Sequence, residues 1–382
     1  MPKNLDLISD RMQELLYDLT TRKPIEQALI ALESGDYSIR WIGAKGETDT
    51  DTNQVCEETP FFIASIDKLY NATILMMLNE TGQLNLDDPI STYLPSIVTR
   101  GLHQLNGVDY TDRITVRHLL SHTSGLADWL EDFPKSGISL INRVIDEGDM
   151  TITINDLVNF VRDQLKPHFP PQDLTINRSK VRYSDTNYMF IIAIIEAVTG
   201  QPLHKVHEQM LYLPLDLRHT YFPGLSKPLD PTPAPMILRI KGCPLHIPLL
   251  MSSIRGIYST VADTITFLRR FIRNEIFQNP VTFASMQAHW NRFGLPFDRA
   301  ALRSPGWPIE YGLGIMRFRL PRIFTSMQTI PPVIGHTGST GCWLFWCTEW
   351  DIFLSGSVDE ITAGSLPYRV VPKILKIFKS LN

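Results

Sequence analysis

Strand-like segments lie at both ends of the chain, and helix-like segments lie between them. Near the amino terminus, Gln27–Glu33 and Tyr37–Gly43 alternate apolar and polar residues and are joined at Ser34–Asp36, which predicts two strands. Near the carboxyl terminus, Cys342–Thr348 and Asp351–Ser357 predict a β-hairpin. We expect one sheet built from both ends of the chain, which makes the middle an insertion.

Apolar residues at helical spacing predict the remaining elements. An amphipathic helix is predicted over Leu5–Leu19 and a closing helix over Val370–Leu381. In the middle of the chain, Ile114–Leu120, Ile154–Asp163 and Met189–Val198 carry the same spacing. The inserted part is therefore predicted to be mainly helical.

Charge and hydropathy exclude several classes of protein. The formal net charge is -4, and the Lys and Arg residues are scattered, so we expect no nucleic-acid partner. The longest apolar run, Tyr188–Ile195, is too short to span a bilayer. The start of the chain lacks the pattern of a signal peptide. We expect a cytoplasmic protein, or an exported one if a leader was removed; the sequence does not address the oligomeric state.

The four cysteines are Cys56, Cys243, Cys342 and Cys347, and their spacings fit no zinc pattern. Cys342 and Cys347 lie five residues apart in a predicted strand, so their side chains point to opposite faces and a disulfide between them is not expected. Free thiols are typical of a reducing compartment.

Ser65-Ile66-Asp67-Lys68 follows an apolar run and opens a strong helix pattern. Positions i and i+3 share a helix face, so Ser65 Oγ and Lys68 Nζ can meet. A serine needs a base to become a nucleophile, and a desolvated lysine can be that base. For this motif alone, the alternative is an exposed helix cap with a solvated lysine.

Two later motifs add to the first. Tyr183-Ser184-Asp185 precedes a helix, and a tyrosine near cations can shuttle protons; alternatively, Tyr183 packs in the core and Ser184 or Asp185 caps the helix. The segment 335–341, Gly-His-Thr-Gly-Ser-Thr-Gly, leads into a strand whose N–H groups can stabilise an oxyanion. The alternative for this segment is a glycine-rich turn.

In this order, the three motifs resemble those of the serine β-lactamase and penicillin-binding protein superfamily, in particular its class C-like branch of DD-peptidases, D-aminopeptidases and family VIII esterases. The family pattern is Ser-x-x-Lys, then Tyr-x-Asn, then Lys-Thr-Gly or His-Thr-Gly. Leu84–Pro95, Ile114–Leu126, Tyr183–Gly200 and Tyr311–Gly314 also look like stretches of that family.

The resemblance implies an α+β fold, a mainly antiparallel sheet flanked by helices with an inserted all-helical lobe. Residues 1–85 and 250–382 would form the first lobe and 86–249 the second, with the active site between them. It also implies that Ser65 is acylated, that Lys68 is its base and that Tyr183 passes protons to the leaving group. The backbone N–H groups of Ser65 and Ser339 would form the oxyanion hole.

The substrate contacts expected from the same motifs are Asp185, His336, Thr337, Gly338 and Trp343. Two of them depart from the family pattern. Asp185 replaces an asparagine and would raise the pKa of Lys68, making it a worse base. His336 replaces a common lysine and is neutral for much of the time at pH 7; when charged, it would attract a substrate carboxylate or tune Tyr183. Both changes disfavour β-lactam turnover.

Other sequence features give weaker indications of function. His204 and His207 share a helix face, but no third ligand is placed, so a surface helix is favoured over a metal site. Ser121 and His122 are too close in sequence to form a productive pair, and the family resemblance makes their stretch structural. Trp343 is either core packing or a wall of the pocket. We expect no metal and no cofactor.

Three functions are compatible with these motifs. The first is a serine hydrolase of small esters or of amides that bear a D-residue. The second is a DD-carboxypeptidase or class C-like β-lactamase that binds penicillin. The third is a catalytically weak binding or regulatory protein that keeps the fold, for which Asp185 is the best argument.

Overall fold

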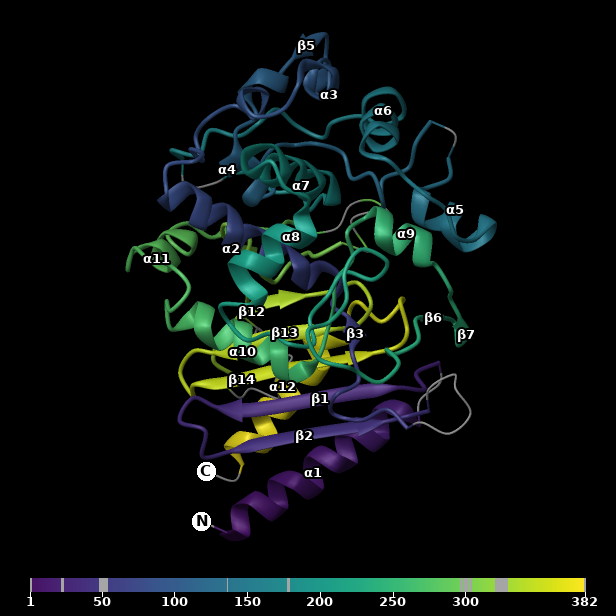
Figure 1. Cartoon of the computed structure of the whole chain (residues 1–382), viewed down its shortest axis with the longest axis vertical. Helices are drawn as coiled ribbons and strands as arrows, with labels where there is room; N and C mark the ends of the chain where they lie inside the picture. Colours follow the sequence, from purple (N-terminus) through teal and green to yellow (C-terminus); the bar gives the residue numbers. More distant parts are fainter. Residues whose placement is uncertain are drawn as a thin grey trace.

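The computed structural model describes residues 2–21, 24–47, 54–135, 137–176, 179–295, 298, 302, 304–319 and 329–380. Within these residues, eight strands form one antiparallel sheet in the order β2-β1-β14-β13-β12-β11-β10-β9 (Figure 1). Their bounds are β1 Ala28–Ser34, β2 Arg40–Lys45, β9 Asn291–Arg292, β10 Ile309–Tyr311, β11 Met316–Phe318, β12 Val333–Thr337, β13 Trp343–Cys347 and β14 Ile352–Val358.

Alternating side chains explain why helices cover both faces of this sheet. On β1, Ala28, Ile30 and Leu32 pack into the core shared with α1 (Pro2–Thr20) and α12 (Pro367–Lys379). Leu29 and Ala31 point the other way, into the core shared with α2 (Asp67–Glu80) and α10 (Val261–Ile272). Every residue of β1 is buried, as expected for a strand between two layers of helices.

The helical half of the molecule lies beyond the β9–β12 side of the sheet (Figure 1). It is centred on α7, which contacts α2 and α4. The bounds of the helices not yet given are α3 Ser96–Thr99, α4 Val116–Leu120, α5 Leu140–Glu147, α6 Ile154–Gln164, α7 Asp185–Thr199, α8 Leu203–His207, α9 Pro248–Ser253 and α11 Thr282–Met286.

Short elements complete the described part of the chain. The 3-10 turns are η1 Ala64–Ile66, η2 Ile90–Thr92 and η3 Thr111–Arg113, and η4 Glu208–Tyr212 is a π-helical turn. Three two-stranded pairs are formed by β3 Phe61–Phe62 with β8 Tyr258–Ser259, β4 Gln104–Leu105 with β5 Val108–Asp109, and β6 Arg239–Ile240 with β7 Cys243–Pro244.

The predicted fold class is confirmed by this sheet and its helices. The second strand starts at Arg40 rather than Tyr37, because the turn after β1 is longer than expected. In that turn, Tyr37 has a φ of 61°, and the Asp36 carboxylate accepts hydrogen bonds from the Ser34 and Ser38 side chains. The predicted end of the last helix at Leu381 lies outside the described residues.

The sheet takes β1 and β2 from the amino-terminal part and the other six strands from the carboxyl-terminal part. The division into residues 1–85 with 250–382 and residues 86–249 stays a prediction, and its boundary at residue 250 falls inside α9. Among the described residues, no single helix is both long enough and apolar enough to cross a membrane. Within the same residues, one bent pair, α7 with the segment Leu203–Tyr212, has the length and composition when taken together, with a bend of 76° between its two parts.

Candidate active site

Ser65 lies in η1, directly before α2, where the chain leaves β3. Its Oγ accepts a hydrogen bond of 2.9 Å from Lys68 Nζ, one helical turn further on. Lys68 is only 4% exposed, and Ile66, rather than Ser65, is the cap residue of α2. The alternative of an exposed cap with a solvated lysine is therefore wrong. The structure places the serine hydroxyl and the amine of a buried lysine side by side.

Two carboxylates surround the Lys68 amine. Asp185 Oδ1, at the start of α7, lies 2.6 Å from Lys68 Nζ, and Asp67 Oδ1 lies 3.8 Å from it. Burial disfavours the charged amine, but Asp185 and Asp67 together hold the pKa of Lys68 well above its ordinary value. Burial also raises the pKa of Asp67 to about 6, against the attraction of Lys68. In the resting protein, Lys68 is an ammonium ion that donates to Ser65.

The Tyr183 ring covers the same amine, with its centroid 5.4 Å from Lys68 Nζ. The side chain is 5% exposed, and Tyr183 Oη makes no hydrogen bond within the part of the chain that the structure describes. Burial raises the pKa of Tyr183 well above its ordinary value, although Lys68 and Ser65 act against this shift. Tyr183 is thus a neutral phenol whose proton is available to another group.

His122 forms hydrogen bonds with the residues on both sides of Tyr183, a role that the sequence did not indicate. Its carbonyl oxygen accepts from the Arg182 N–H at 3.1 Å, and its Nδ1 accepts from the Ser184 N–H at 3.2 Å. The Asn187 side-chain amide also lies 3.0 Å from His122 Nδ1. The His122 and Tyr183 ring centroids are 4.3 Å apart, and His122 is fully buried with a φ of 56°. The two residues on either side of Tyr183 are therefore held by one histidine.

The tautomer of His122 follows from these contacts. Because Nδ1 accepts from a backbone N–H, the ring proton must be on Nε2. That Nε2 has no hydrogen-bond partner among the described residues. Burial, together with the charges of Lys68 and His336, lowers the pKa of His122 well below its ordinary value, so the ring is neutral. The only signal in the sequence was its place in the Ser121–Ser124 stretch.

The turn after β12 packs directly against the residues before Ser65. A Cβ on Gly338 would lie 2.7 Å from Ala64 Cβ and 2.3 Å from Cys342 Sγ, so the approach requires glycine. Cys342 Sγ donates to the Ile63 carbonyl at 3.1 Å, and burial raises the pKa of this thiol to about 12. Ser339 is exposed and lines the same cavity as Ser65.

Two of the predicted substrate contacts lie behind the site. His336 is fully buried, with Nδ1 2.7 Å from the Thr337 carbonyl and Nε2 3.0 Å from Tyr311 Oη. Burial and the charge of Lys68 lower the pKa of His336 to about 3, so it offers no positive charge to a substrate carboxylate. Trp343 is fully buried on the sheet face that packs against α1 and α12. Of its two predicted roles, core packing is the one observed.

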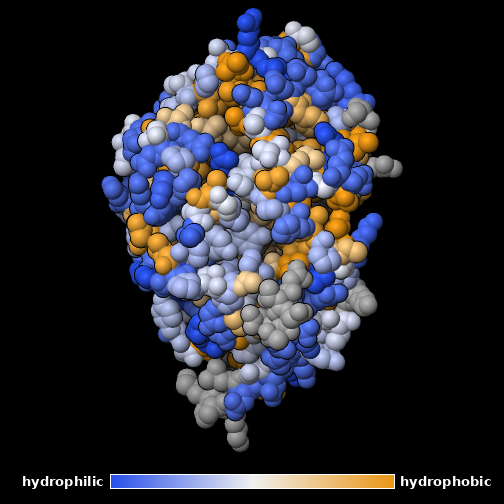
Figure 2. All heavy atoms as spheres, turned by 45° about the vertical axis from the view of Figure 1, so that its right-hand side comes forward, coloured by the Kyte–Doolittle hydropathy of each residue, from blue (hydrophilic) through white to orange (hydrophobic). Residues whose placement is uncertain are grey.

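The other predicted residues open onto one large cavity of about 2320 Å³. It is bordered by Ser65, Lys68, Tyr183, Asp185 and the segment 337–340, and it extends between the helices of the helical half. Figure 2 turns the side of the molecule with α5 and α9 toward the viewer and shows hydrophobic patches within the hydrophilic surface there. The pocket therefore combines a polar reaction centre with an apolar extension.

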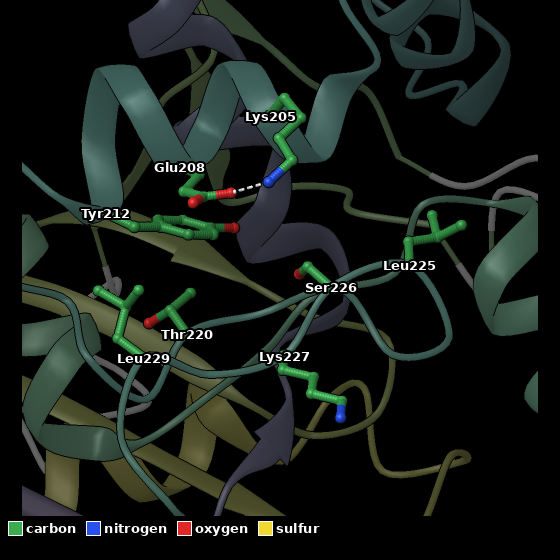
Figure 3. A pocket seen from close by; sticks show the side chains of 8 residues that line it. All are labelled: Lys205, Glu208, Tyr212, Thr220, Leu225, Ser226, Lys227 and Leu229. Carbon is green, nitrogen blue, oxygen red and sulfur yellow. Dashed lines mark hydrogen bonds and ion pairs between the residues drawn. The ribbon is translucent and has the colours of Figure 1, made fainter.

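A second hollow of about 180 Å³ lies elsewhere, beside α8 and η4 (Figure 3). Lys205 and Glu208 form an ion pair of 2.7 Å over Tyr212 there. The surface helix predicted around His204 and His207 is partly wrong, because His207 is fully buried and contacts Asn71 Oδ1 at 2.9 Å. No group of three or more potential metal ligands occurs in the described ranges.

A sequence model of the family described as Beta-lactamase matches residues 30–355. The chain belongs to the beta-lactamase family. The predicted resemblance is thus confirmed.

Among curated proteins, the chain is similar to the putative penicillin-binding protein PbpX of Bacillus subtilis, with 27% identity over 225 residues. The match covers 57% of this chain and 48% of the relative. It is also 29% identical over 175 residues to a putative D-alanyl-D-alanine carboxypeptidase of Escherichia coli, 45% of this chain and 36% of the relative.

The matches to these curated relatives span about half of their length or less. Among solved structures, a D-stereospecific amidohydrolase from Streptomyces sp. is 25% identical with a TM-score of 0.71, covering 95% of this chain and 97% of that one. The hydrolase EstCE1 is 20% identical with a TM-score of 0.68, covering 97% and 98%, which supports the fold. Asp185 contacts Lys68 directly, and the charge of Lys68 helps to lower the pKa of His336.

Proposed function

We propose that the chain is a serine hydrolase that forms an acyl-enzyme on Ser65 and acts on small esters or on amides bearing a D-residue. The observation that carries this proposal is the 2.9 Å contact between Ser65 Oγ and the buried Lys68 Nζ at the edge of the large cavity. The similarity to the Streptomyces D-stereospecific amidohydrolase over nearly the whole chain supports the amide branch.

Acylation requires Lys68 as a neutral amine. Ser65 Oγ then bonds to the carbonyl carbon while its proton moves to Lys68 Nζ. The bond from the carbonyl carbon to the leaving atom breaks, and Tyr183 gives its phenolic proton to that atom. Lys68 returns its extra proton to the Tyr183 phenolate. Water repeats these transfers in deacylation: its oxygen bonds to the acyl carbon, one of its protons passes through Tyr183 and Lys68, and Ser65 Oγ leaves and is reprotonated.

The negative oxygen of the tetrahedral intermediate needs donors that are already in place. We propose that these are the N–H groups of Ser65 and Ser339, on opposite sides of the close contact between Gly338 and Ala64. The Cys342 thiol donates a hydrogen bond to the Ile63 carbonyl and so fixes the distance between the turn after β12 and the residues before Ser65. A small shift of either segment would move one donor out of reach.

The carboxylates around Lys68 determine the pH at which this chemistry operates. Because Asp185 and Asp67 hold the amine protonated, the fraction of neutral Lys68 grows as the pH rises. We therefore expect the hydrolysis rate to increase from neutral to alkaline pH. The fully buried His336 adds no positive charge, so it does not lower the pKa of Lys68 at neutral pH.

Hydrolysis of p-nitrophenyl acetate and butyrate tests the proposal. We expect a burst of p-nitrophenol equal to the concentration of protein, with loss of burst and turnover in Ser65→Ala. D-phenylalanine amide and its L-enantiomer, assayed in parallel, separate the ester branch from the amide branch. An unchanged rate in folded Ser65→Ala protein would refute the assignment of Ser65 as nucleophile.

A DD-carboxypeptidase that binds penicillin is the second candidate, and one observation favours it. Arg369 of α12 borders the same cavity as Thr337 and Ser339, so a cation is available to a substrate carboxylate despite the neutral His336. This candidate predicts a covalent adduct of labelled penicillin on Ser65 that is weakened by Arg369→Ala. Mass spectrometry without an adduct in the wild-type protein would exclude penicillin binding.

A further inference from the structure

One face of α7 lines the cavity along almost the whole helix. Its lining residues recur at the spacing of a single helical stripe: Asp185, Tyr188, Met189, Ile192, Ala193, Glu196 and Ala197. The first of them touches Lys68, and the helix rises 1.5 Å per residue, so the stripe reaches about 16 Å from the reaction centre at Glu196. Between its two acidic ends, the stripe is apolar apart from the hydroxyl of Tyr188.

Apolar side chains of two further helices border the same cavity. They are Ile141, Val144 and Ile145 of α5, and Leu250 and Met251 of α9. Ile145 is 38% exposed, so part of its side chain is open to the cavity. We call this apolar extension, bordered by α7, α5 and α9, the α7 groove.

Hydrogen bonds hold α5 and α9 in place. The Asp149 carboxylate, which follows α5, accepts from the Leu249 and Leu250 N–H groups at the start of α9, at 2.8 and 2.9 Å. The Ile152 N–H donates to Ser253 Oγ at 3.1 Å. The two helices are thus connected through the segment between α5 and α6, and the groove is part of the fold.

The groove ends in charged groups. Glu196 Oε1 lies 3.8 Å from Arg255 Nε and also accepts from the Leu203 N–H at 2.9 Å. A ligand in the groove would therefore meet apolar side chains for most of its length and polar groups at the far end. A linear hydrocarbon chain has this shape and chemistry.

We propose that the α7 groove binds the acyl chain of the substrate, so that the protein prefers esters or amides of medium- and long-chain acyl groups. This inference rests on the proposed function, because it places the scissile carbonyl at Ser65. Each methylene buried in the groove should raise kcat/KM by about fourfold until the chain reaches Glu196.

Tryptophans introduced at different positions along the stripe test the proposal, because a tryptophan inside the groove should limit the length of the acyl chain that the groove accepts. Met189→Trp, Ala193→Trp and Ala197→Trp would place the new side chain about 6, 12 and 18 Å from Asp185. We expect Met189→Trp and Ala193→Trp to lose the longer acyl esters, with a longer limit in the second, whereas Ala197→Trp, beyond Glu196, should keep the wild-type limit and the wild-type rate with p-nitrophenyl acetate. Acetate esters of long alcohols should show no such limit.

Several results would overturn this inference without touching the proposed function. They are Ser65-dependent acetate hydrolysis with no dependence on acyl length, an equal cut-off in all three variants, or a length dependence on the alcohol side alone. A separate arm uses calorimetric binding of dodecanoate to Ser65→Ala protein, which does not need catalysis. We expect binding there and at least tenfold weaker binding when Ala193→Trp is added; equal binding would refute the groove even if no ester were hydrolysed.

Discussion

Replacing Asp185 with asparagine tests how the protein controls its lysine. The carboxylate oxygen lies 2.6 Å from Lys68 Nζ, and at an effective dielectric constant near 20 this attraction amounts to about 6 kcal/mol. Asp67, at 3.8 Å, contributes about 4 kcal/mol on the same scale. Asp185→Asn keeps an oxygen that can accept from Lys68 but removes the larger of the two attractions, so the pKa of Lys68 should fall.

The expected result is a gain of activity at neutral pH. A lower pKa leaves more Lys68 neutral at pH 7, and a tenfold gain in kcat/KM needs only about 1.4 kcal/mol of this attraction. The assay is the pH profile of p-nitrophenyl butyrate hydrolysis from pH 6 to 10, in which the rising limb should move to lower pH. Asp67→Asn should move the rising limb in the same direction by less. Asp146→Asn changes an exposed carboxylate of α5 that is not among the groups acting on Lys68, so it should leave the limb unchanged.

Loss of activity at every pH in folded Asp185→Asn protein would refute this reasoning. That result would mean that Asp185 itself takes part in moving the serine proton. A profile that does not shift would show that Lys68 is not the titrating base. Circular dichroism and the thermal midpoint of each variant would establish that the protein is folded.

Three further predictions follow from the site and the core. Gly338→Ala, whose Cβ would lie 2.7 Å from Ala64 Cβ, should lower kcat by about a hundredfold through the oxyanion donors, whereas Gly294→Ala, with nothing within 4 Å, should not. His122→Phe keeps a ring beside the tyrosine but loses the Nδ1 acceptor, so kcat should fall tenfold or more with little change in KM. Burial lowers the pKa of His207 to about 3, so stability should fall as the pH drops from 6.5; His207→Phe should flatten urea-measured stability over that range, by about 3 kcal/mol at pH 4.5. A flat wild-type profile would refute the last prediction.

The sheet was predictable because its strands carry an alternation that depends only on local sequence. The Ser65 and Lys68 pair was predictable for a similar reason, since their spacing fixes a shared helix face. The first residues of the strands were harder to predict. The turn before Arg40 is lengthened by hydrogen bonds from serine side chains to an aspartate, and the alternation of apolar and polar residues does not indicate such bonds. Local periodicity thus predicts which helices and strands form better than it predicts their first and last residues.

The electrostatics of the site depended on contacts that the sequence does not show. Asp185 was expected to act on Lys68, but the approach of Asp67, beside it in the chain, appears only in three dimensions. The neutral, buried His336 results from packing against Tyr311. His122 acts on residues about sixty positions away, and its neighbours in sequence give no signal of that contact. Burial and long-range contacts decide these features.

The proposed chemistry requires that Ser65 becomes acylated. Peptide mapping by mass spectrometry after an acid quench, within milliseconds of mixing the protein with p-nitrophenyl butyrate, tests it directly. We expect a butyryl group on the peptide that contains Ser65, at near-stoichiometric level in the burst and absent from Ser65→Ala. Turnover without any acyl group on that peptide, or an acyl group on another residue that persists in Ser65→Ala, would contradict it.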